Sequence, residues 1–176
     1  MVYLPNQPAG TYPLFVDSNS YETGGFTLQV RQLPATPPPA NDSCSAPTAI
    51  TLGPIGVMGN TTGAIDDYSV ASNPRYASAC GNRFMNGRDA VFVFTASTTG
   101  SFVARVAPQG VFDPALLLLN GSCSVTQCVR ASDSAGPGGG EAITFSASAG
   151  QTFFFVVDSA DGSAPSGYGS FTISVQ

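Results

Sequence analysis

The chain has 176 residues, is 43% hydrophobic and only 10% charged, and carries a formal net charge of −5 with a pI near 4.2. That acidic balance argues against nucleic acid and anionic membranes as partners. Because histidine and lysine are both absent, the sequence excludes a Ser-His-Asp triad, a histidine-ligated zinc and a lysine Schiff base. No stretch is apolar over the roughly 20 residues that a membrane helix needs. We therefore expect neither an enzyme nor a membrane-inserted protein.

The first thirty or so residues repeat the end of the chain at a spacing of about 140 residues. Thr11–Ser18 (TYPLFVDS) matches Thr152–Ser159 (TFFFVVDS), and Gly25–Val30 (GFTLQV) matches Ser170–Val175 (SFTISV). Residues 1–32 are therefore predicted to be the C-terminal strands of a preceding or partner copy of the same β-domain, with strands over 1–5, 11–17 and 25–31.

Such a segment lacks the sheet to which its strands belong. Isolated pairs of strands are marginal in water, and their unpaired edges associate readily. We expect the segment to lie on its own chain, to belong to a longer tandem array, or to add strands to a second copy. The residues expected to make the contact are Tyr12, Leu14, Phe15, Val16, Phe26, Leu28 and Val30.

A proline-rich stretch, residues 33–40, follows and favours an extended spacer of about 3 Å per residue. Residues 41–176 then form the complete domain. Short apolar runs bounded by Gly, Pro, Asn and Asp, such as Ala115–Leu119 and Phe153–Val157, are typical of central strands in a sandwich. We predict an all-β, two-sheet β-sandwich with strands near 48–52, 56–62, 89–96, 100–107, 114–119, 141–147, 151–158 and 169–176.

Four cysteines allow three disulfide pairings. The pairing Cys44–Cys80 with Cys123–Cys128 is favoured here, because residues 121–128 resemble a hairpin loop closed by its own disulfide; free thiols or a metal site are the alternatives. Disulfides predict an oxidising, extracellular or cell-surface location. Met1 is followed by neither a basic nor an apolar signal region, so we expect the natural start to lie upstream or a leader to have been removed.

Several motifs resemble those of the bacterial pre-peptidase C-terminal domain, in the cysteine-containing form repeated in secreted myxobacterial-type proteins. They are Asn41–Cys44, Gly87–Phe94, Phe112–Leu119, and Ala149–Asp158 followed by Gly169–Ile173. The resemblance implies a jelly-roll-like sandwich on a secreted protein and a non-catalytic role. It also implies relatives that bind calcium or extracellular matrix.

Acidic and aromatic residues in loops supply further candidates. Asp66, Asp67, Asp158 and Asp161 could give calcium its oxygen ligands, or could be solvated turn carboxylates. Asp89 and Asp113 precede apolar strands, where structural roles are expected. Asp89 could cap backbone N–H groups or pair with a neighbouring arginine, and Asp113 with Pro114 could form the turn that begins a strand. The loop aromatics could stack on sugars or pack over the rim of the sandwich. They are Tyr68, Tyr76, Phe84 and Tyr168.

Two functions follow from these features. The first is a non-catalytic extracellular structural protein that associates with itself, or with adjacent repeats, head to tail into a fibre or surface array. The alternative is a binding module that targets a secreted hydrolase or adhesin to polysaccharide or matrix protein. Apart from calcium, no cofactor is expected.

Overall fold

In the computed structural model, the chain is described over residues 10–17, 23–32, 37–68, 80, 85, 87–159, 162 and 165–176. Two compact units divide it, Met1–Thr36 and Pro37–Gln176. Over the described residues, no helix is long and apolar enough to cross a membrane.

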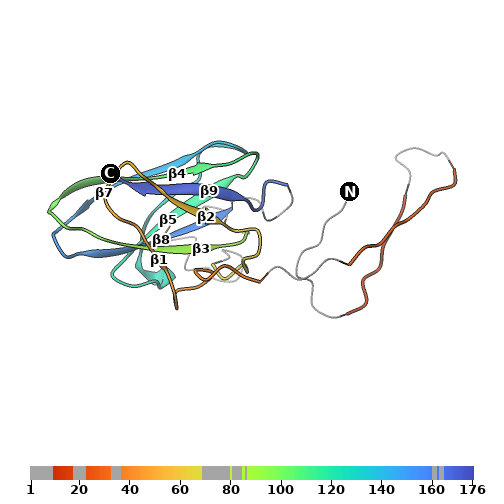
Figure 1. The fold of residues 1–176 in the computed structure, drawn as a ribbon, viewed down its shortest axis with the longest axis horizontal. Helices are drawn as coiled ribbons and strands as arrows, with labels where there is room; N and C mark the ends of the chain where they lie inside the picture. The colour runs from red at the N-terminus through yellow and green to blue at the C-terminus, as the bar shows by residue number, and fades with distance from the viewer. Residues whose placement is uncertain are drawn as a thin grey trace. The chain divides into compact units, whose positions relative to one another are not determined.

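The second unit is a sandwich of two sheets (Figure 1). One sheet has five strands in the order β1 (Thr48–Ala49), β3 (Ala90–Thr95), β8 (Thr152–Ser159), β5 (Pro114–Asn120) and β6 (Cys128–Ser132). The other has four strands in the order β2 (Val57–Asn60), β9 (Ser170–Val175), β4 (Gly100–Pro108) and β7 (Glu141–Ala147). The prediction of an all-β, two-sheet sandwich is confirmed.

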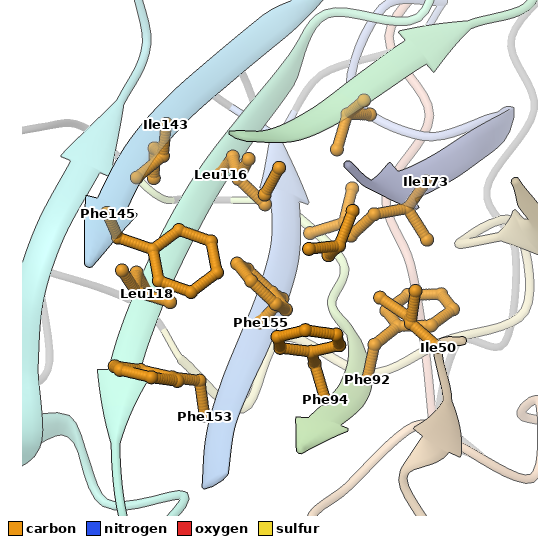
Figure 2. Packing of buried hydrophobic residues seen from close by; sticks show 14 of the residues in the cluster. Ile50, Phe92, Phe94, Leu116, Leu118, Ile143, Phe145, Phe153, Phe155 and Ile173 are labelled. Carbon is orange, nitrogen blue, oxygen red and sulfur yellow. The ribbon is translucent and has the colours of Figure 1, made fainter. Parts of the chain in front are cut away.

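Alternate residues of the strands meet between the two sheets and form the main core. Figure 2 shows Phe145 of β7 close to Phe153 and Phe155 of β8, with ring centroids 5.0 and 5.7 Å from Phe145. Both contacts are edge-on, an arrangement that aromatic rings prefer over face-to-face stacking.

The outer face of the five-stranded sheet is covered as well. Val91, Leu117 and Val156 point away from the main core but are fully buried in a second apolar cluster, with Tyr68 and Met85. This cluster lies beneath the loop segments that precede β3. The continuous apolar runs of β5 and β8 follow from this arrangement, because both faces of these central strands are buried.

Two strand predictions differ from the structure. β6 was not predicted, because its sequence, Cys-Val-Arg-Ala-Ser, has only one large apolar residue and follows a short 3-10 turn, Val125–Gln127. In the first unit, no strand forms within the described residues, so the strands predicted over 11–17 and 25–31 are absent. These segments have no sheet of their own to pair with. The strand predicted over 1–5 falls outside the described residues.

Candidate functional site

A pair of buried acids lies where β3 and β8 meet. Asp89 immediately precedes β3 and Asp158 is in β8, and the register Ala90↔Val157 makes the two acids neighbours. Both side chains are fully buried. Asp89 Oδ2 accepts from the backbone N–H groups of Asp67 and Tyr68, at 2.6 and 2.9 Å. The predicted capping role of Asp89 is therefore confirmed.

Asp158 is held in a similar way, since its Oδ1 accepts from the N–H groups of Gly87 and Ser159. The remaining oxygens, Asp89 Oδ1 and Asp158 Oδ2, receive no N–H or O–H donor from the protein. The two carboxyl groups interact electrostatically, since the charge of Asp158 raises the pKa of Asp89. Two ionised carboxylates would repel each other in this buried place, which favours a proton on one of them.

Burial raises the pKa of both acids. Desolvation is the largest cause at Asp89, whose pKa lies well above its usual value, and the charge of Asp158 raises it further. Burial raises the pKa of Asp158 to about 7, although the hydrogen bonds from the Ser159 and Gly87 N–H groups oppose that shift. The pair therefore retains a proton to higher pH than exposed aspartates do, and it fastens the segment around residues 67–68 and Gly87 to the sheet.

Two disulfides also attach loop segments to the five-stranded sheet. Cys44 pairs with Cys123, and Cys80 pairs with Cys128. The predicted pairing of Cys44 with Cys80 and Cys123 with Cys128 is wrong. The loop of residues 121–128 is not closed on itself, because its two cysteines bond to two different segments that cover the five-stranded sheet. Each disulfide thus joins a distant loop to the β5–β6 connection.

The loop aromatics do not form a sugar-binding platform in the described part of the chain. Tyr68 is 6% exposed, and its hydroxyl lies against Cys123 Sγ at 3.0 Å. Burial raises the pKa of Tyr68 to about 12. Tyr168 lies beneath Arg88, whose guanidinium carbon is 4.9 Å from the ring centroid. Tyr76 and Phe84 lie outside the described residues.

The predicted calcium ligands are not gathered into a metal site. Among the described residues, no group of three or more Asp, Glu, Cys or His side chains is placed to hold a metal ion. Asp66 and Asp67 are exposed, whereas Asp158 is buried with its Oδ1 bonded to backbone N–H groups. Asp161 lies outside the described residues. Asp113, the second acid given a structural role, is also buried, and its N–H donates to Ser166 O.

The predicted assembly residues are all on the surface. Phe15 is 90% exposed, Val30 76% and Phe26 68%, and the other four are between 44% and 54% exposed. Those four are Tyr12, Leu14, Val16 and Leu28. Large apolar side chains rarely gather in the open on a soluble monomer without a binding role. This segment is the most apolar exposed part of the described chain.

Sequence reasoning did not find the pairing of Asp89 with Asp158. A signal was present: one acid precedes the apolar run Ala90–Phe94, and the other follows the run Phe153–Val157. Antiparallel pairing of those two runs places the acids side by side. Glu141 was also missed; it accepts from Ser132, Ser134 and Ala135 and so connects β7 to the segment after β6.

No family model and no curated protein matches the chain. Among solved structures, it is similar to the pre-peptidase C-terminal domain of collagenase from Bacillus anthracis. The TM-score is 0.47 and the identity 15%, over 73% of this chain and 93% of that one. A likeness of this size assigns neither a family nor a function.

Proposed function

We propose that this chain is a non-catalytic structural protein of the extracellular space or cell surface that associates head to tail into a fibre or array. Residues 10–32 supply the contact. The observation that carries this proposal is the exposure of all seven predicted assembly residues, from 44% at Tyr12 to 90% at Phe15. Burying each such side chain would contribute about 1.5–3 kcal/mol before the cost of ordering the segment.

The association is open-ended because of where residues 10–32, the donor segment, lie in the chain. The donor segment belongs to the first unit, whereas any sandwich that receives it belongs to the second unit of another copy. Such a contact joins two different surfaces, and a heterologous contact that does not close into a ring continues into a filament. The proline-rich residues 33–40 would set the spacing between successive sandwiches.

Two disulfides are consistent with a secreted protein, because thiols are kept reduced in most cytosols. The alternative, a module that binds polysaccharide or matrix protein, has less support. Tyr68 is buried and Tyr168 is stacked against Arg88, so neither presents an open ring.

Light scattering and negative-stain electron microscopy on the full chain test the proposal. Particles should grow with protein concentration, and a Phe15→Asp/Leu28→Asp chain should stay monomeric. Val111→Asp is the matched control, because Val111 and Leu28 are both 54% exposed but Val111 lies in the sandwich unit. A wild-type chain that stays monomeric at every concentration would exclude the proposal.

A further inference from the structure

Exposed large apolar residues gather in a second place, on the sandwich itself. Of those outside the first unit, Leu52, Ile55, Met58 and Ile65 lie within one stretch, and Val111 and Val129 are isolated. Ile55 is 84% exposed and Met58 71%, comparable to the most exposed residues of the first unit. Residues 51–65 contain no charged side chain.

This stretch forms one edge of the four-stranded sheet. Leu52 makes a bridge to Val175 at the end of β9, and β2 pairs with the rest of β9 from Val57↔Ile173 to Asn60↔Ser170. β2 is the outermost strand of its sheet. We call the surface made by Leu52, Ile55 and Met58 the β2 edge patch.

The other sheet edges offer less to a new strand. β6 and β7, the edges on the opposite side of the sandwich, are joined to each other: Arg130 Nη1 of β6 donates to Thr144 O of β7 at 3.0 Å, and Ser132 donates to Glu141. β1 has only two residues. Natural sheets commonly protect their edges with charges, as β7 is protected by Arg130. The β2 edge patch has no charge in the sequence around it.

We propose that the β2 edge is the acceptor for the segment Gly25–Val30 of a second copy, which adds a strand to the four-stranded sheet. This inference rests on the proposed head-to-tail association and names its receiving surface. The occupant is a second copy because the chain carries an uncharged apolar donor and an uncharged apolar acceptor, each left exposed in the described structure.

The sequences of the two strands suit this pairing. β2 already pairs antiparallel with Ser170–Val175 (SFTISV), and Gly25–Val30 (GFTLQV) nearly repeats that strand. Successive residues of a strand point to opposite faces, so Phe26, Leu28 and Val30 share one face. Placing Leu28 beside Met58 puts that apolar face on the β2 edge patch, and such cross-strand pairs are the unit of sheet stabilisation.

Substitutions in the full chain test the acceptor. Met58→Asp should weaken association about tenfold or more, to the same degree as Leu28→Asp, because either change places a carboxylate in an apolar contact. Val111→Asp should leave association unchanged. If Leu28→Asp abolishes assembly and Met58→Asp does not, the β2 edge is excluded while the proposed function stands. If the wild-type chain does not assemble, both are excluded.

Crosslinking then identifies the partner. A Leu28→Cys chain mixed with a Met58→Cys chain should give disulfide-linked heterodimers, because directly opposed strand residues approach to about 4.5–5.5 Å. A Val111→Cys chain in place of the Met58→Cys chain should give none. Dimers linked 58 to 58 would instead show symmetric β2–β2 pairing and overturn the proposal. A chain that carries both cysteines could instead form a disulfide within one molecule at low concentration. That result would show that the segment binds its own sandwich, and it would exclude a second copy as the source of the added strand.

Discussion

Asp89 and Asp158 are two fully buried carboxyl groups at neighbouring strands of the five-stranded sheet. Asp89 Oδ2 holds the backbone N–H groups of Asp67 and Tyr68, and Asp158 Oδ1 holds those of Gly87 and Ser159. A proton on one acid lets both be buried together, because two ionised carboxylates would repel. The pair holds the segment around residues 67–68 and Gly87 against the five-stranded sheet. The strength of this attachment therefore depends on pH, because it depends on the protonation of the two acids.

Stability should fall as pH rises from about 4 to 7. The pKa of Asp158 is about 7 in the folded chain against its usual 3.8, so the folded state holds a proton that the unfolded state has released. Stability from this group is complete below the usual pKa and is lost as pH rises through the folded pKa, with a slope of up to about 1.4 kcal/mol per pH unit. Burial also raises the pKa of Asp89, so this group adds to the loss of stability in the same direction.

Urea unfolding at pH 5 and pH 8 measures this effect. The Asp158→Asn chain should show a weaker pH dependence, because the amide remains neutral throughout. Asp17→Asn, in the first unit, should leave the dependence unchanged. A wild-type chain that is more stable at pH 8 than at pH 5 would contradict the assignment. Asp66 raises the pKa of Asp158 through its charge and can change the slope, whereas Tyr68, whose pKa is about 12, stays neutral over this pH range.

The disulfide connectivity can be checked by peptide mapping without reduction. We expect one linked peptide pair to contain Cys44 and Cys123, and another to contain Cys80 and Cys128. Replacing either pair by serine should lower the free energy of unfolding by about 4 kcal/mol, since the cysteines are 79 and 48 residues apart. A Cys123–Cys128 peptide would contradict this structure.

Leu116→Ala and Leu117→Ala should destabilise the domain to a similar degree, by about 2–5 kcal/mol. The two side chains point to opposite faces of β5, yet both are fully buried. Leu116 lies in the main core, and Leu117 lies in the second apolar cluster on the outer face of the sheet. Chemical denaturation gives the comparison. A Leu117→Ala chain as stable as wild type would mean that the outer face of this sheet is open to solvent.

Gly59→Ala should cost roughly 1–3 kcal/mol through overpacking. A Cβ at Gly59 would lie 2.3 Å from Phe171 Cζ, and the Phe171 ring is fully buried and has no room to move. Gly100→Ala, at the start of β4 in the same sheet, is the control, because its nearest contacts are 4.0 Å away. Thermal unfolding of the two variants should separate them clearly, and equal melting temperatures would contradict the packing described around Phe171.

The strands that could be predicted are those whose pattern of apolar and polar residues shows which of their faces are buried. The alternation in β4 and the continuous apolar runs of β5 and β8 reveal one or two buried faces directly in the sequence. β6 was missed because only Cys128 of its five residues is buried, so its sequence has neither an alternating nor a continuous apolar pattern. The disulfide pairing, the Asp89–Asp158 contact and the β2 edge patch are likewise set by which strands become neighbours, and a local pattern does not contain that information.

The start of the sandwich unit is bound to β3, the second strand of the five-stranded sheet. Asn41 O accepts from the N–H of Val91 at 2.7 Å, and Asn41 Nδ2 donates to Val91 O at 3.1 Å. At the other end, Gln176 exchanges two backbone hydrogen bonds with Val103 in the opposite sheet. In a fibre under tension, a pull on the proline-rich linker would therefore enter the sandwich at β3, in one sheet, and leave at the β2 edge of the other sheet, where the next copy would bind. The force would cross the apolar core between the two sheets.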